Sequence, residues 1–200
     1  QLSFLILPPS TDWVQNTAVA TTKWGDIGDW DVSGVVDFSW AFSKHRDATG
    51  GSYVLNGNPK AATFVGTAMS KWTTTSATSL YGTFFQVNEM NSDLSGWSVA
   101  KVISLSYTFQ SASKYTGTGL SLWDTASITN LGATFSDASE MNADLSTWKV
   151  NKVTSLDNTF SRAPKFVGTG LNLWDTASVT TLQNTFYKAG VMNADITGWK

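Results

Sequence analysis

Tryptophan recurs along this chain at intervals of 25 or 26 residues, and this spacing restricts the possible folds more than any other feature. The regular series is Trp72, Trp97, Trp123, Trp148, Trp174 and Trp199. A phenylalanine follows each of the first five by twelve residues, at Phe84, Phe109, Phe135, Phe160 and Phe186. A fixed interval of this length is typical of repeat proteins, in which each unit packs on its neighbours. We therefore expect a solenoid of stacked coils.

The residue pattern inside one coil predicts its local structure. Around Trp148, apolar residues alternate with polar ones, which favours a short strand with one buried face. Leu156, Phe160 and Ala163 then follow the i, i+4, i+7 spacing of one helical face. The predicted fold class is α/β: a leucine-rich-repeat-like solenoid of 25/26-residue coils, each with a short parallel strand and a short helix, and an N-terminal cap.

The repeat register also predicts how the chain is divided. Residues 1–23 fit no repeat, so we expect an N-terminal cap there, followed by a repeat solenoid over 24–200. The longer interval between Trp30 and Trp72 indicates an insertion at about 43–63, expected as a surface loop or small hairpin because loops accept added residues. A solenoid that stopped within a strand would expose half a core, so we expect the native chain to continue past residue 200.

Composition excludes several classes of function. Thirteen basic residues against fifteen acidic ones give a formal charge of −2. This balance argues against nucleic acid and against an anionic membrane as the main partner, since both attract basic surfaces. The chain has no cysteine, which excludes disulfides, thiol catalysis and zinc–thiolate sites. No stretch is apolar for long enough to predict membrane insertion in this segment.

The segment LWDTASVTTLQNTFYKAGVMNADITGW, residues 173–199, resembles a known repeat. It is similar to the 26-residue repeat of bacterial surface proteins and lipoproteins in the BspA-like leucine-rich group, and the resemblance covers about 24–200. The chain departs from that pattern where threonine replaces methionine before the phenylalanine, as at Thr134, and where alternate coils carry Gly-Thr-Gly. The resemblance implies a leucine-rich-repeat-like solenoid on a cell surface, often linked to adhesion. It transfers no catalytic residue.

The repeating tryptophans and threonines have two interpretations each. The tryptophans could form an aromatic platform for sugar rings, but we favour a core position, since stacked exposed tryptophans would promote aggregation. A threonine precedes the phenylalanine in five coils: Thr83, Thr108, Thr134, Thr159 and Thr185. Such a row could match an ice lattice, but a hydroxyl bonded back to a helix carbonyl is the simpler expectation.

The residues that follow four tryptophans are the first candidate binding site. Asp124, Lys149, Asp175 and Lys200 each come one residue after an inward tryptophan, so all four should point outward. Opposite charges would alternate along neighbouring strands about 4.8 Å apart. The row is either a partner surface or a set of mutually neutralising charges, and the two interpretations are compatible.

Two further sets of residues are weaker candidates. The insertion contains His45 and Tyr53, and it is the one break in a regular surface, so we expect a specific contact there. Asp26, Asp29 and Asp31 could ligate calcium, although aspartate more often caps turns through its own backbone. We predict no catalytic residue, no cofactor and no other metal site.

These observations lead to a functional hypothesis. We expect a non-catalytic extracellular protein that mediates adhesion or protein–protein recognition at a cell surface. The alternative is a structural building block of an extracellular filament, sheath or shell, and a third possibility is a glycan-binding module or glycan-active enzyme. The expected partner is a protein or glycan at a cell surface, or another copy of the chain.

Overall fold

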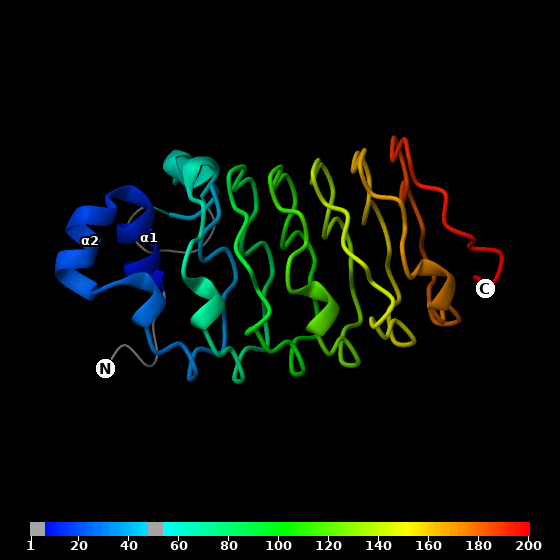
Figure 1. Ribbon diagram of the computed structural model, residues 1–200, viewed down its shortest axis with the longest axis horizontal. Coiled ribbons are helices and arrows are strands. Elements are labelled where there is room, and N and C mark those ends of the chain that lie inside the picture. The colour runs from blue at the N-terminus through cyan, green and yellow to red at the C-terminus, as the bar shows by residue number, and fades with distance from the viewer. Residues whose placement is uncertain (1–6, 48–53) are drawn as a thin grey trace.

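The computed structural model describes residues 7–47 and 54–200, which form an elongated row of coils lying side by side (Figure 1). Two short helices, α1 (Leu7–Gln15) and α2 (Thr17–Trp24), lie at the N-terminal end of the row. The other helices are short 3-10 segments: η1 (Ile27–Asp29), η2 (Pro59–Thr63), η3 (Met69–Lys71), η4 (Leu120–Leu122) and η5 (Leu171–Leu173). Three of these, η3, η4 and η5, end immediately before a tryptophan of the repeat.

Helix α1 packs against the first coil. The ring of Trp13 in α1 meets the ring of Trp30 edge-on, with 5.8 Å between centroids. The buried hydroxyl of Ser10 donates a hydrogen bond to the carbonyl of Ala41 at 2.8 Å. These contacts cover the aromatic end of the first coil. The boundaries of the expected cap at 1–23 stay a prediction.

The predicted fold class, an α/β leucine-rich-repeat-like solenoid, is wrong. No β-strand occurs in the described part of the chain, and its described residues contain no α-helix after Trp24. Parallel pairing is limited to isolated bridges: Asp37 with Ser79, Ser104 with Asn130, Asn130 with Ser155, and Ser155 with Thr181. The coils are instead built from consecutive turns, and the sequence repeat fixes their register.

Backbone hydrogen bonds explain why the predicted helix is absent. Leu156, Phe160 and Ala163 are buried as expected, but Asn158 and Arg162 between them have left-handed φ angles of 55° and 52°. A right-handed helix does not contain such residues. Alternate N–H groups bond to carbonyls of the next coil, from Leu156 to Thr181, Asn158 to Gln183, Phe160 to Thr185 and Arg162 to Tyr187. These N–H groups, which a helix would bond to carbonyls of its own segment, therefore bond to the neighbouring coil instead.

Turns also replace the strand predicted around Trp148. The N–H of Trp148 bonds to the carbonyl of Leu145 at 3.0 Å, and the N–H of Val153 bonds to that of Val150 at 2.8 Å. These turn bonds occupy groups that a parallel strand would offer to its neighbours. Pairing between coils is consequently reduced to single bridges.

The core is a set of stacked aromatic rings, as the repeat predicted. Trp148 is 3% exposed and lies between Trp123 and Trp174, with 6.4 Å between centroids on each side and rings nearly parallel. The phenylalanines form a second stack, in which Phe135 and Phe160 are 5.7 Å apart. The interpretation of the tryptophans as core residues is confirmed.

Each repeat tryptophan also joins its coil to the preceding one by a hydrogen bond. The indole N–H of Trp148 donates to the carbonyl of Leu120 at 2.9 Å, and that of Trp174 donates to the carbonyl of Leu145 at 3.2 Å. The same bond recurs at Trp72, Trp97, Trp123 and Trp199. Because a buried indole N–H needs a partner, this bond makes tryptophan specific to the position.

The threonine row lies inside the molecule. Thr134 is fully buried, and its hydroxyl lies 2.7 Å from the carbonyl oxygen of Leu131 in its own coil and 3.0 Å from that of Leu105 in the preceding coil. The other four threonines of the row repeat this geometry. The expected bond to a carbonyl three residues back is present, but it closes a turn rather than a helix.

Replacing Thr134 with valine should lower the free energy of unfolding by about 1–2 kcal/mol, because two buried carbonyls lose a donor while the shape is kept. Thr154→Val is the matched control, since Thr154 is exposed and its hydroxyl makes one bond, to the carbonyl of Thr129 at 3.2 Å. The control should change stability by about 0.5 kcal/mol or less. Urea unfolding measures both variants, and equal losses would contradict a special role for the buried row.

The described part of the insertion is exposed at 54–56 and 59–60 but also has buried positions, and the expected surface loop stays a prediction. Within it, Asn58 and Ala61 are fully buried. The side-chain oxygen of Asn58 accepts a hydrogen bond from Gln15 in α1 at 2.6 Å. The insertion therefore contacts helix α1 as well as the first coil. This contact explains why some of its described residues are buried.

Candidate functional site

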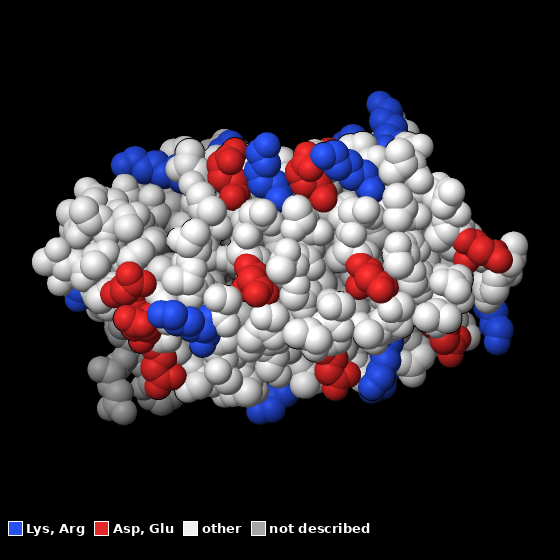
Figure 2. All heavy atoms as spheres, in the orientation of Figure 1, with Lys and Arg blue, Asp and Glu red and all other residues white. Residues whose placement is uncertain are grey.

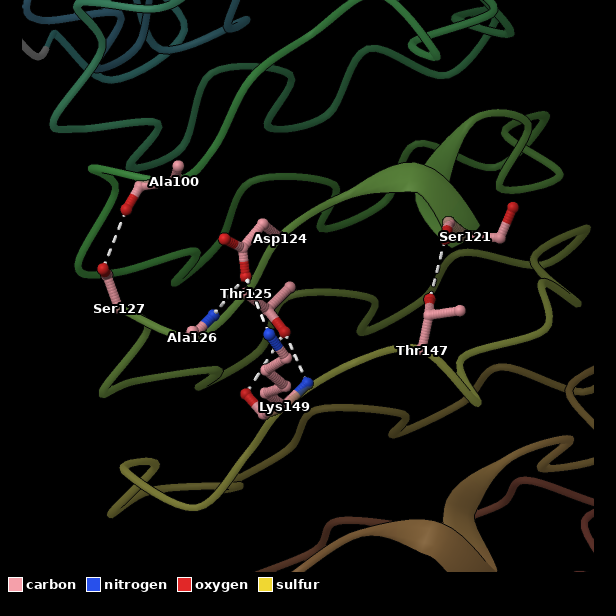
Figure 3. Close-up of polar contacts among 8 residues, drawn as sticks. All are labelled: Ala100, Ser121, Asp124, Thr125, Ala126, Ser127, Thr147 and Lys149. Carbon is pink, nitrogen blue, oxygen red and sulfur yellow. Dashed lines mark hydrogen bonds and ion pairs between the residues drawn. The ribbon is translucent and has the colours of Figure 1, made fainter.

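The four residues that follow a tryptophan form an exposed row, here called the charge row: Asp124, Lys149, Asp175 and Lys200. The ammonium of Lys149 lies 3.7 Å from a carboxylate oxygen of Asp124 (Figure 3). Both side chains are more than half exposed, so this ion pair contributes little to stability. All four residues are exposed because each follows a tryptophan that points toward the core.

Backbone bonds fix the register of the charge row. The hydroxyl of Thr125 accepts a hydrogen bond from the N–H of Lys149 at 2.7 Å and lies 3.2 Å from its carbonyl oxygen (Figure 3). The hydroxyl of Thr176 likewise accepts from the N–H of Lys200 at 2.9 Å. Neighbouring coils therefore cannot slide past one another at this row, and the spacing of its charges is fixed.

The two aspartates of the charge row also stabilise turns. A carboxylate oxygen of Asp124 accepts from the N–H of Ala126 at 3.3 Å, and one of Asp175 accepts from the N–H of Ala177 at 3.2 Å. Within the described residues, the close ion pair of the row is the one between Asp124 and Lys149. The row is thus an extended surface feature rather than a convergent cluster.

The structure does not support His45 as a surface contact. Its side chain is 7% exposed, and its ring packs on Phe85 with 4.7 Å between centroids. Burial lowers the pKa of His45 below its ordinary value, because the charged form loses solvation. Tyr53 lies outside the described residues, so its predicted role stays a prediction.

The three aspartates considered for calcium are not brought together. Asp26 caps η1 by accepting from the N–H of Gly28 at 2.9 Å, and Asp31 accepts from the hydroxyl of Ser33 at 2.6 Å. Asp29 forms an ion pair with Lys71 at 3.4 Å. Over residues 7–47 and 54–200, no group of three or more histidines, aspartates or glutamates is placed to hold a metal ion. Each carboxylate instead makes a local contact.

A second alternating row was missed by the sequence analysis. It consists of the residues seventeen positions after successive tryptophans: Glu89, Lys114, Glu140 and Lys165. Lys165 pairs with Glu140. The hydrogen bond from Lys165, together with the charges of Lys165 and Lys114, lowers the pKa of Glu140 below its ordinary value. The sequence contains the signal for this second row, because its residues recur at a fixed distance from the tryptophans, as those of the charge row do.

The surface view places these charges in context. Figure 2 shows acidic and basic side chains alternating along one edge of the molecule, while much of the face between the edges is uncharged. In the same two coils as Glu140 and Lys165, and three positions earlier in each, Arg162 makes two hydrogen bonds to Asp137, at 2.6 and 2.9 Å. Opposite charges on successive coils thus accompany the stack on more than one side.

None of the helices in the described part of the chain is long and apolar enough to cross a membrane.

Comparison with known proteins gives one match. A protein-family model described as "Mycoplasma protein of unknown function, DUF285" matches residues 58–119 and 116–200. No curated protein and no solved structure matches the chain. The match agrees with the coarser part of the expected resemblance, a bacterial surface repeat protein, whereas the BspA-like leucine-rich assignment is not confirmed.

Proposed function

We propose that this chain, which belongs to the family described as Mycoplasma proteins of unknown function, is a non-catalytic recognition module. In this proposal it acts at the outer cell surface, where it mediates adhesion by binding a protein or glycan partner. The absence of enzymatic activity is part of the proposal and stays a prediction.

The observation that carries the proposal is the exposed charge row. Successive coils place Asp124, Lys149, Asp175 and Lys200 at the same exposed position, and threonine bonds fix their register. Stacked repeats form extended binding surfaces in this way, with the core kept constant and the outward positions free to vary. Charges arranged on such a surface favour rapid and selective association more than they favour raw affinity.

The charge row can be tested by reversing its central charge. Lys149→Glu sets three carboxylates in a row, so binding should weaken at low ionic strength, and the difference should shrink with added salt. Because the pair is exposed, unfolding should become easier by only about 0–1 kcal/mol. We would coat beads with the folded chain and count the beads retained by cultured cells, and measure stability by urea unfolding.

Lys152→Glu is the matched control. It makes the same charge change in the same coil, at an exposed residue outside the charge row. Retention should fall for Lys149→Glu and remain for Lys152→Glu. If beads that carry the folded chain are retained no better than beads that carry the urea-unfolded chain, the proposed adhesion function is wrong.

A specific observation favours a building block as the second candidate. The row Glu89, Lys114, Glu140 and Lys165 alternates in sign with a period of two coils. A second copy displaced by one coil would place lysine opposite glutamate along this row. Sedimentation at low and high salt distinguishes the candidates: salt-sensitive self-association supports the building block, and a monomer at all concentrations contradicts it.

A further inference from the structure

A surface hollow that no repeating pattern predicts spans three successive coils. It has a volume of about 250 Å³. Its walls are formed by Ser106, Tyr107, Asn130, Gly132, Ala133, Ser155, Asp157 and Asn158. None of these residues is basic. The hollow combines one aromatic side chain with several hydroxyl, amide and carboxylate groups.

The hollow lies where the side chain at one repeat position changes from tyrosine in one coil to alanine in the next. The position ten residues after the tryptophan holds Trp40, Gly82, Tyr107, Ala133 and Asn158 in successive coils. Tyr107 is followed by the small Gly132–Ala133 pair, so the space beside its ring is not filled. Tyr107 is 38% exposed and lines the hollow.

Neighbouring rings hold Tyr107 in place. The ring of Tyr81 meets it at 5.4 Å between centroids with an interplanar angle of 65°, and the ring of Phe85 meets it at 6.4 Å and 61°. These edge contacts restrict the ring before any ligand arrives, which reduces the entropy cost of binding. Tyr107 thus forms a fixed aromatic wall of the hollow.

Two polar side chains that line the hollow are held in place by bonds to the protein. The side-chain oxygen of Asn130 accepts from the hydroxyl of Ser106 at 2.8 Å and from the N–H of Gly132 at 2.7 Å. One carboxylate oxygen of Asp157 accepts from the N–H of Gln183 at 2.8 Å and from Thr181. Among the described residues, the amide nitrogen of Asn130 and the second oxygen of Asp157 make no hydrogen bond. The lining of the hollow therefore includes one donor group and one acceptor atom that the protein itself does not use.

We propose that this hollow binds one pyranose ring of a neutral glycan, with the apolar face of the sugar against Tyr107 and its hydroxyls on Asn130 and Asp157. The face of an aromatic ring carries a negative electrostatic potential, which attracts the C–H groups of a sugar ring. Sugar hydroxyls both donate and accept, so they match the amide and the carboxylate. With Asp157 in the wall and no lysine or arginine, acidic sugars should be repelled. This inference rests on the proposed recognition function and names the class of partner.

The test uses variants that the repeat itself supplies. Tyr107→Asn removes the ring, and asparagine already occupies this position with the same left-handed φ at Asn158 and Asn184, so the fold should be kept. Asp157→Asn removes the charge and keeps an oxygen for the Gln183 bond. Tyr187→Ser is the control, since Tyr187 is exposed on another coil and Ser161 occupies the matching position.

Saturation-transfer NMR with lactose, maltotriose and chitotriose, one at a time, gives the readout. At least one of these neutral saccharides should receive saturation on its ring C–H protons, and 3′-sialyllactose should receive less than lactose. Tyr107→Asn and Asp157→Asn should each lower the affinity by about tenfold, while Tyr187→Ser should not. No transfer to any neutral saccharide, or equal transfer with Tyr107→Asn, would overturn the proposal.

Failure of this proposal can be told apart from failure of the proposed function. If beads that carry the chain adhere to cells but no saccharide binds, recognition stands and the saccharide site is wrong. If saccharides bind at Tyr107 but the beads do not adhere, the site stands and the adhesion function is wrong. Unchanged adhesion after enzymatic removal of the cells' glycans would also contradict the saccharide site as the means of attachment.

Discussion

Trp148→Ala should lower the free energy of unfolding by about 3–5 kcal/mol, which is the usual cost of truncating a large buried aromatic side chain. Trp148 is 3% exposed and stacks on a tryptophan at each side. Its removal would also leave the carbonyl of Leu120 without the indole donor. Urea unfolding followed by circular dichroism measures the loss.

Two further variants separate the contributions of ring and hydrogen bond. Trp148→Phe keeps an aromatic ring but loses the bond to Leu120, so it should cost about 1–3 kcal/mol. Trp199→Ala should cost less than Trp148→Ala, because Trp199 is only partly buried and, among the tryptophans of the described residues, stacks on Trp174 alone. A loss below about 1 kcal/mol for Trp148→Ala would mean that the ring is not a core element.

Gly170→Ala should destabilise the chain by about 3–5 kcal/mol through backbone strain and overpacking. Gly170 has a φ of 90°, which side chains rarely adopt, and an added Cβ would lie 2.5 Å from the Cα of Ser146 in the preceding coil. The obstacle is backbone, so it cannot rotate away. Thermal and urea unfolding should both show the loss.

The chain provides a matched control in Gly190. An added Cβ there has no atom within 4 Å, and its φ lies outside the left-handed region. Gly190→Ala should leave stability within about 0.5 kcal/mol or raise it slightly by restricting the unfolded chain. Equal losses of stability for the two variants would show that the close approach of the coils does not require glycine at position 170.

Burial and exposure at the main repeat positions could be predicted from the sequence, whereas secondary structure and features confined to one coil could not. The tryptophans, phenylalanines and threonines of the repeat are buried, except for the partly buried Phe186 and Trp199, and the charge row is exposed. This follows because a constant interval places equivalent residues at equivalent positions. The same interval places Glu89, Lys114, Glu140 and Lys165 at one equivalent position. A full comparison of coil positions would have found this row. The hollow at Tyr107 was missed because it arises where one coil differs from the next.

Secondary structure was predicted wrongly for a reason that lies in the backbone. The spacing of Leu156, Phe160 and Ala163 is compatible with a helix and also with consecutive turns that bring every fourth residue inward. Left-handed residues distinguish the two, and they are readable where asparagine occurs, as at Asn158. They are not readable at Tyr107, Ala133 or Arg162, whose side chains do not favour that conformation. Local sequence therefore could not reveal that half the donors serve a neighbouring coil.

The close fit between glycines and the adjoining coils has a consequence for how such a gene can change length. An added Cβ at Gly117 or Gly168 would lie within 3 Å of the side chain of Ala143 or Ala194, so a coil with Gly-Thr-Gly fits beside one with Asn-Ala-Asp. Duplication or loss of a single coil would set two coils of one kind side by side and disturb this fit. Duplication or loss of a pair would preserve every interface. Recombination should therefore lengthen or shorten proteins of this type by two coils at a time.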